Sequence, residues 1–261
     1  MKKEQIRELY KKKIKEFKHH NFLYFEKNNP KLTDGDFDKL KNEILELEKN
    51  YKYLNDKDSP SDSIGFKPSK NFKKILHNVP MLSLANAFTQ EDLLNFEKKI
   101  LNYLDRGSDF EIKYSAEPKI DGISASLIYR HGKFITGLSR GDGKEGEDIT
   151  ENLKTIEDIP HNIKSENFPD EIDIRGEVFI QNSDFKKLSD KFANPRNAAS
   201  GSLRQKDPKE TKKIPLKFIA YAFGFEKGME VYNESDFLHK LSMWGFKTNP
   251  HNKLIKGTKN L

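Results

Sequence analysis

Apolar side chains recur every three or four residues in two stretches near the N-terminus, with lysines at many of the positions between them. The apolar positions are Ile6, Tyr10, Ile14 and Phe17 in the first stretch, and Phe37, Leu40, Ile44 and Leu47 in the second. This spacing predicts two amphipathic helices, over residues 1–20 and 35–49. Thr33 or Asp34 can cap the second helix, so we expect a helical hairpin.

The polar, turn-rich run 58–65 predicts a linker. We therefore divide the chain into a small helical domain, residues 1–68, and a second domain, residues 69–261. A helix begins in the second domain at the capping-box-like run 89–92 and continues to Leu104. The remaining elements are expected as strands at 110–118, 123–130, 133–139, 171–180 and 216–225, helices at 147–157 and 234–244, and a loop with a short helix at 193–207.

The connections between several of these strands are short, which decides how the strands pair. His131 and Gly132 form a two-residue turn typical of a β-hairpin. Strands joined in this way are antiparallel. The second domain is therefore predicted to be mixed and largely antiparallel, and the whole chain belongs to the α+β class.

Composition narrows the class of protein further. The 261 residues include 19 Phe and 9 Tyr, enough for a packed core, and carry a net charge of +6. That excess suits nucleic acid or another polyanion, or reflects an AT-rich genome. No apolar run reaches the roughly 18 residues of a membrane span, and the N-terminus lacks the apolar stretch of a signal peptide. With no cysteine, disulfides and thiolate zinc sites are excluded, and we expect a cytoplasmic protein.

Lys119, within the run 115–122, is the strongest candidate for chemistry. A lysine becomes a nucleophile only after losing its proton, which partial burial or nearby positive charge promotes. If this run is a strand, Glu117, Lys119 and Asp121 point to the same face. Gly122 then allows the backbone or a ligand to approach closely. The alternative is a surface hairpin with a solvated lysine.

The segment 141–146 literally matches G-x-G-x-x-G, but it follows a hairpin strand and its variable positions are charged. A dinucleotide-binding Rossmann motif needs a parallel βαβ unit, so we favour a loop that folds around a ligand or nucleic acid. Arg140, just before the loop, is suited to a phosphate or ribose contact, or it is a solvated strand end.

Two further stretches carry charge among small or apolar residues. Glu177 lies within a predicted strand, where a carboxylate needs a partner, either a ribose or metal ion or a salt bridge to Arg175 or a lysine. The small-residue run 194–205 contains Arg196 and Arg204, which suit phosphate binding. The alternative there is a tightly packed helix with two exposed arginines.

Five segments together resemble the bacterial NAD-dependent DNA ligases in order and spacing. They are Pro80–Leu84, Glu117–Gly122, Arg140–Thr150, Arg175–Phe179 and Ala193–Ala198. The run from Tyr24 to Asp38 looks like the small helical nicotinamide-mononucleotide-binding domain of that family. The resemblance extends from about residue 5 to residue 250, and it implies a nucleotidyltransferase (adenylation) fold for the second domain.

The resemblance implies a role for each matched position. Lys119 would attack the α-phosphate of NAD and carry AMP. The nicotinamide mononucleotide half would meet Tyr24, Asp34, Gly35, Asp36, Phe37 and Asp38. The AMP half would meet Ser83, Leu84, Glu117, Asp121, Gly122, Arg140, Glu177 and Tyr221, with Tyr221 stacked on the adenine. Arg196 and Arg204 would face the DNA.

The implied partners are NAD as co-substrate and nicked double-stranded DNA, in replication and repair. Mg²⁺, with Mn²⁺ as an alternative, would offset phosphate charge, and no residue is assigned as a metal ligand. We expect a bacterial cytoplasmic monomer that contacts no membrane.

The family continues beyond the segments matched here. An Asp-Gly-Val-Val-x-Lys segment, a further lysine, an oligonucleotide-binding barrel, a cysteine zinc site and helix-hairpin-helix elements are not among the 261 residues, so zinc is expected only in that absent region. We therefore expect a chain truncated before these motifs that binds NAD but seals nicks poorly or not at all. The alternatives are an ATP-dependent nucleotidyltransferase with the same Lys-x-Asp-Gly signature, against which the N-terminal helices argue, and a non-catalytic NAD-binding ligase fragment.

Two aromatic positions depart from the family pattern. Phe25 stands where Tyr or His is common, and Phe37 stands where the family has Tyr. Each loses a polar group while keeping a ring that can stack. We expect Phe37→Tyr to lower the Michaelis constant for NAD, measured by the rate of self-adenylation. An unchanged or higher constant would contradict this prediction.

Overall fold

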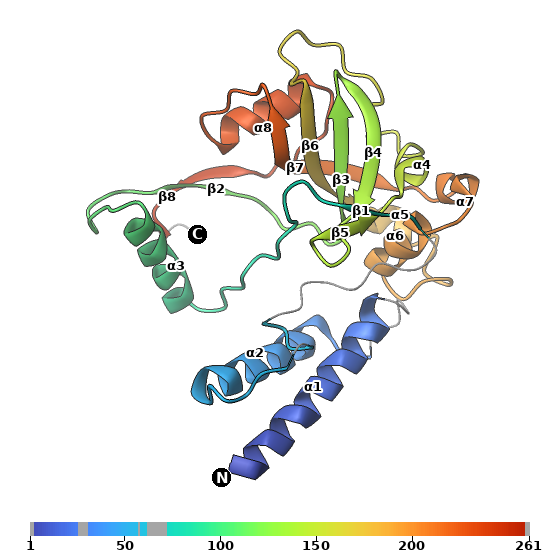
Figure 1. Cartoon of the computed structure of the whole chain (residues 1–261). Helices are drawn as coiled ribbons and strands as arrows, with labels where there is room; N and C mark the ends of the chain where they lie inside the picture. The colour runs from blue at the N-terminus through green and yellow to red at the C-terminus, as the bar shows by residue number, and fades with distance from the viewer. Residues whose placement is uncertain (1–2, 26–30, 57, 62–71, 259–261) are drawn as a thin grey trace.

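The computed structural model describes residues 3–25, 31–56, 58–61 and 72–258. Two helices come first, and they are followed by a four-stranded antiparallel sheet with helices around it and two small two-stranded sheets (Figure 1). The predicted α+β class is therefore confirmed. None of the helices within the described ranges is long and apolar enough to cross a membrane.

The N-terminal helices form the predicted hairpin. Helix α1 spans Lys3–Phe25 and helix α2 spans Asp34–Asn50. Thr33 caps α2, because its side chain accepts a hydrogen bond from the Asp36 amide at 3.2 Å. The predicted apolar positions form a small core of their own: Ile6, Tyr10, Ile14, Phe17, Leu40 and Ile44 are buried, with Phe37 and Leu47 packed against them.

The beginning of the predicted linker belongs to this helical unit instead. Ser59 is fully buried and donates to Glu48 Oε1 at 2.5 Å, while Lys18 pairs with Asp58 at 2.6 Å. The linker prediction is therefore wrong for residues 58–61 (Asp58–Ser61), because their polar side chains find partners on α1 and α2. Residues 62–65 lie outside the described residues.

The main sheet has the strand order β4-β3-β6-β7, and every pairing in it is antiparallel. Its strands are β3 (Ile123–Arg130), β4 (Lys133–Ser139), β6 (Glu171–Phe179) and β7 (Lys217–Lys227). His131 and Gly132 have φ of 46° and 74°, as a tight hairpin turn requires, so the predicted β3–β4 hairpin is confirmed.

Three longer helices also match their predictions. Helix α3 (Gln90–Tyr103) begins with a capping box between Thr89 and Asp92, and it buries none of its residues. Helices α6 (Pro195–Leu203) and α8 (Glu234–Met243) contribute to the core that lies against the sheet. Their buried members in that core are Ala198, Ala199, Leu203, Phe237 and Leu241.

The helix predicted over 147–157 is largely wrong. Strand β5 (Glu145–Glu147) comes first, and helix α4 covers only Thr150–Leu153. The Ile149 amide donates to Gly137 O at 2.9 Å, and the Thr150 hydroxyl accepts from the Gly137 amide at 2.9 Å. These hydrogen bonds hold the start of the stretch against β4, so it does not form a longer helix. The helical spacing of Ile149, Leu153 and Ile156 still buries all three.

The strand predicted over 110–118 is also shorter than expected. Strand β2 covers only Lys113–Ala116 and pairs with β8 (Lys253–Lys256), which the sequence did not indicate. It ends two residues before Pro118, which has no amide hydrogen for a ladder. The other unpredicted elements are β1 (Lys74–Leu76), which pairs with β5, and the short helices α5 (Asn182–Phe185) and α7 (Pro208–Lys212).

The core of the helical hairpin gives a stability prediction. Ile44 is completely buried between α1 and α2, and truncation of a buried Ile to Ala costs about 2–5 kcal/mol. We expect the helical unit of Ile44→Ala to unfold at a clearly lower urea concentration than that of the wild type. Far-UV circular dichroism measures the midpoint of this transition. The exposed Asn42→Ala is the matched control, and equal midpoints for the two variants would contradict the prediction.

Candidate functional site

Lys119 lies in the irregular connection between β2 and β3, and not on a strand. The prediction that strand alternation aligns Glu117, Lys119 and Asp121 is therefore wrong. The Lys119 side chain is exposed, so of the two routes by which a lysine loses its proton, partial burial and nearby positive charge, partial burial is not what the fold provides. Gly122 does permit the close approach predicted for it: a Cβ there would lie 2.2 Å from Val178 O on β6.

The centre of the site is a polar patch across three neighbouring strands. Ser124 on β3 and Glu177 on β6 are direct partners in the register, and the Ser124 hydroxyl donates to Glu177 Oε2 at 2.9 Å. Tyr221 reaches the same patch from β7, where the register shifts between Arg175 and Gly176 and leaves Tyr221 as the extra residue. The bulge therefore places Tyr221 beside Glu177.

Glu177 is only 8% exposed. Burial raises the pKa of its carboxyl group above the usual value, while hydrogen bonding from Ser124 and the positive charges of Arg196, Lys119 and Arg140 act in the opposite direction. Burial also raises the pKa of the Tyr221 hydroxyl, and the charge of Glu177 adds to that rise. These effects require proximity, so the fold brings Lys119, Arg140, Glu177 and Tyr221 together.

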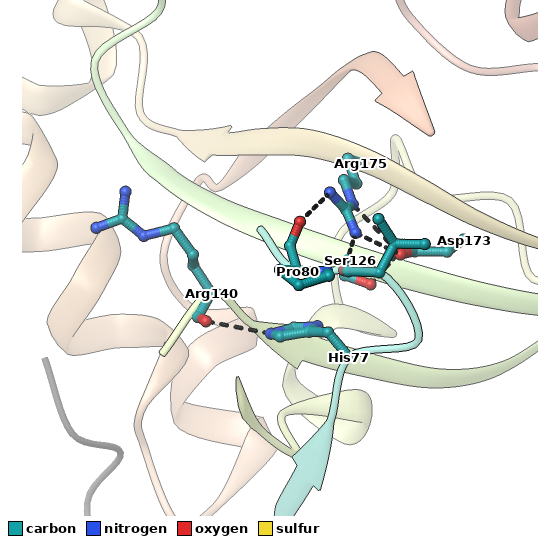
Figure 2. A network of polar contacts seen from close by, with 7 residues as sticks. His77, Pro80, Ser126, Arg140, Asp173 and Arg175 are labelled. Atoms are coloured by element: carbon teal, nitrogen blue, oxygen red, sulfur yellow. Dashed lines mark hydrogen bonds and ion pairs between the residues drawn. The ribbon is translucent and has the colours of Figure 1, made fainter. Parts of the chain in front are cut away.

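The alternative pairing of Glu177 with Arg175 is not found. Arg175 instead pairs with Asp173 on its own strand, at 3.1 Å from Nη2 to Oδ2. Figure 2 shows the Arg140 side chain directed away from this pair, while its carbonyl oxygen contacts the His77 ring at 3.1 Å. Arg140 is half-buried, so the solvated strand end considered for it is not what the fold provides.

The two arginines expected to face DNA have partners within the chain. Arg196 Nη1 contacts Asp121 Oδ1 at 2.8 Å, which ties α6 to the Lys119 connection. Arg204 Nε contacts Oε2 of the buried Glu147 at 2.9 Å, and its Nη1 donates to Ser200. Arg196 therefore joins the site around Lys119, whereas Arg204 contacts Glu147 on β5, the strand at the end of the glycine loop.

The glycine loop 141–146 is a tight connection from β4 to β5. Gly141 and Gly143 have φ of 58° and 88°, and Asp142 Oδ1 accepts the amides of Lys144 and Glu145 at 2.9 Å each. Because β4 and β5 belong to antiparallel pairings, rejection of the Rossmann interpretation is confirmed.

Glu117 is half-buried and accepts a hydrogen bond from Ser115 at 3.2 Å. Burial raises the pKa of its carboxyl group. Glu234, at the start of α8, is a neighbour that sequence reasoning missed: its side chain is exposed, and partial desolvation together with the charge of Glu117 raises its pKa to about 7. Ser124 was missed as well. Pairing of β3 with β6 identifies Ser124, and the charge of Glu117 identifies Glu234.

Ser83 and Leu84 follow the buried Met81 and are themselves exposed, Leu84 to 77%. The same segment touches the helical hairpin, because Asn86 Nδ2 donates to Asp38 Oδ2 at 3.2 Å. Asp38 thus contacts the second domain from the hairpin, and the segment after Met81 lies between the two groups of candidate residues.

Several candidate residues on the hairpin have contacts within the hairpin itself. Phe37 stacks on Phe17 with ring centroids 5.2 Å apart, so its ring packs in the hairpin core. Asp36 accepts a hydrogen bond from the Thr33 hydroxyl at 2.7 Å, and Gly35 is exposed beside it. The side chains of Tyr24, Phe25 and Asp34 lie outside the described residues.

A nucleotidyltransferase of the adenylation type, preceded by a helical NAD⁺-binding domain, is the class of protein that these features define. Residues 69–261 match the profile of the NAD-dependent DNA ligase adenylation domain, and residues 3–65 match that of the DNA ligase-like N-terminal NAD⁺-binding domain. The chain belongs to the NAD-dependent DNA ligase family.

Curated relatives agree with this assignment. The chain is 66% identical to a DNA ligase of Pelagibacter ubique over 97% of its own length, 44% identical to one of Parvibaculum lavamentivorans over 90%, and 42% identical to one of Bradyrhizobium sp. over 99%. It spans 37%, 34% and 37% of the length of these relatives. The chain therefore corresponds to somewhat more than a third of each.

The buried carboxylate gives a prediction about pH. Because burial raises the folded pKa of Glu177, the folded chain binds more protons than the unfolded chain between the two pKa values, and stability falls as pH rises through that window. Glu177→Gln removes this charge, so we expect its melting temperature to exceed that of the wild type near pH ~8 and the difference to shrink towards pH ~4.

Thermal denaturation across this pH range is the measurement. Glu157→Gln, at an exposed position, is the matched control and should change the melting temperature little. A Glu177→Gln protein that melts below the wild type near pH ~8 would contradict the prediction.

Proposed function

We propose that this chain performs the first step of NAD-dependent DNA ligation, the transfer of AMP from NAD to Lys119. The nitrogen of the neutral amine would attack the phosphorus of the AMP half of NAD. A P–N bond forms, the P–O bond to the bridging oxygen breaks, nicotinamide mononucleotide leaves, and the amine releases its proton to solvent. The observation that supports this proposal best is the convergence of Lys119 with Arg140, Glu177 and Tyr221 in a chain of this family.

The other site residues divide between recognition and charge. Arg140 and Glu177 would hold the ribose, Tyr221 would stack on the adenine, and Ser83, Leu84 and Glu117 would line the same pocket. Asp121, paired with Arg196, would fix the Lys119 connection, and Gly122 would let it lie close to β6. Because Lys119 is exposed, bound NAD and the helical domain would have to supply the cover that excludes water.

The helical domain would hold the nicotinamide mononucleotide half. We assign residues 1–68 to it, with Tyr24, Asp34, Gly35, Asp36, Phe37 and Asp38 as the contact residues, and residues 69–261 to the adenylation domain. Gripping both halves of NAD orients the leaving group opposite the lysine. The contact between Asp38 and Asn86 supports an approach of the hairpin to this side of the second domain.

Mg²⁺ enters this proposal only with the substrate. The described residues hold no group of three or more His, Asp or Glu side chains that could bind a metal ion. Mg²⁺ often keeps several waters and binds through substrate phosphates, so we place it, or Mn²⁺, on the phosphates of NAD and assign it no protein ligand.

The later steps belong to the proposal for the whole protein. AMP would pass to the 5′-phosphate of a nick in double-stranded DNA, and the 3′-hydroxyl would then displace it, in replication and repair. Arg196 and Arg204 would approach the DNA backbone. We place this protein in the bacterial cytoplasm as a monomer.

Intact mass after incubation with NAD and Mg²⁺ tests the proposal. We expect one AMP added to the wild type, none to Lys119→Ala, and none when ATP replaces NAD. Lys113→Ala, an exposed lysine on the adjoining strand β2, is the matched control and should still gain AMP.

The other outcomes point to the alternatives. An adduct formed with ATP indicates the ATP-dependent nucleotidyltransferase. Measurable NAD binding without an adduct indicates a non-catalytic fragment, and neither binding nor adduct contradicts the proposal as a whole. A nick-sealing gel with the same protein tests the later steps separately.

A further inference from the structure

A buried ion pair fastens the segment 77–81 to the main sheet. Arg175 donates from Nη1 to Pro80 O at 3.1 Å and from Nη2 to Val79 O, while Nη2 also contacts Asp173 Oδ2 at 3.1 Å (Figure 2). One guanidinium therefore joins the carboxylate on its own strand to two carbonyl groups of a segment almost a hundred residues earlier in the chain.

Both side chains of the Asp173–Arg175 pair are largely buried. Asp173 is 2% exposed, and its second oxygen accepts the hydroxyl hydrogen of Ser126 on β3. On β7, a Cβ at Gly224 would lie 2.2 Å from Asp173 Oδ2 and 2.3 Å from Arg175 Nη2. Any larger residue at position 224 would displace the pair, so β7 leaves space for it.

The segment 77–81 in turn carries the glycine loop. The His77 amide donates to Lys144 O at 2.9 Å, and the Met81 amide donates to Gly143 O at 2.8 Å. The His77 ring also contacts Arg140 O at 3.1 Å (Figure 2). The backbone of Arg140 and the loop that follows it are therefore held by the segment that Arg175 fastens.

A buried ion pair is by itself weak evidence for stability, because desolvation offsets much of the attraction. Its contacts here instead fix one backbone segment relative to another, and that segment leads directly to Ser83 and Leu84. We propose that the Asp173–Arg175 pair is a positioning element, which holds the segment 77–81 and thereby the glycine loop and Arg140 in the geometry that binds the AMP half of NAD. This inference rests on the proposed function, and Arg175 itself would not touch the nucleotide.

Hydrogen exchange of the backbone amides tests the positioning without any ligand. We expect Arg175→Met to accelerate exchange in 77–81 and 141–146 by about tenfold or more, while β6 and β7 stay protected. Because Arg175→Met leaves Asp173 buried and unpaired, the double variant Asp173→Asn/Arg175→Met, which removes both charges, is measured beside it. Gly224→Ala, which crowds the pair without removing it, should act in the same direction.

Arg130→Met is the matched control. It removes an arginine of β3 that pairs with Glu171 of β6, at an exposed position away from the segment 77–81. In this control variant, exchange of the amides in 77–81 and 141–146 should not change. Wild-type exchange of the segment in a folded Asp173→Asn/Arg175→Met protein would overturn the proposal.

The kinetics of adduct formation separate positioning from a general loss of structure. We expect the NAD concentration for half-maximal rate to rise about tenfold in the double variant, with the limiting rate within about threefold. On an Arg140→Met background the same two substitutions should add less than about twofold, because Arg175 acts through Arg140. Equal, independent losses on both backgrounds would overturn the inference.

The two proposals fail in different ways. If the wild type forms no adduct, the proposed function is wrong, and exchange alone decides whether the pair positions the loop. Suppose instead that the wild type forms the adduct, and that variants with faster exchange in the segment 77–81 bind NAD as tightly as the wild type. The proposed function then stands and the positioning role is wrong.

Discussion

The antiparallel register of β3, β6 and β7 is the constraint on which the rest of the site depends. It sets Ser124 opposite Glu177, and the shift beside Gly176 adds Tyr221 to the same patch. A register that slipped by one residue would turn Glu177 to the opposite face of the sheet, into the apolar core. The site is therefore a property of strand pairing, and the loops that carry Lys119, Arg140 and Arg196 are arranged around it.

Charge balance explains how this patch tolerates a buried carboxylate. Glu177 has lost most of its contact with water, and three cationic side chains and one hydroxyl group offset part of that cost. The same cations would attract a phosphate once a nucleotide arrives. A site built in this way gives up some stability for binding, which is common where a protein must bind charge. The exposed Lys119 fits an arrangement that substrate binding completes.

Two separate cores support this arrangement. The helical hairpin packs around its own apolar cluster, and the sheet with α6 and α8 forms another. The contact between Asp38 and Asn86 joins the hairpin to the segment that also leads to Ser83 and Leu84. The two cores correspond to the two family profiles, that of the N-terminal NAD⁺-binding domain over residues 3–65 and that of the adenylation domain over residues 69–261.

The sequence by itself determined the helical hairpin, the hairpin of β3 and β4, and the candidate residues around Lys119, because helical spacing, turn residues and charged motifs are local signals. Only the tertiary structure decided that 117–121 is not a strand, that 147–157 is mostly not a helix, and that Ser124 and Glu234 join the site. The pairing of Arg204 with Glu147 and of Arg175 with Asp173 was equally hidden. These outcomes depend on contacts between residues far apart in the chain, whose energies override local preference and leave no periodic pattern to read.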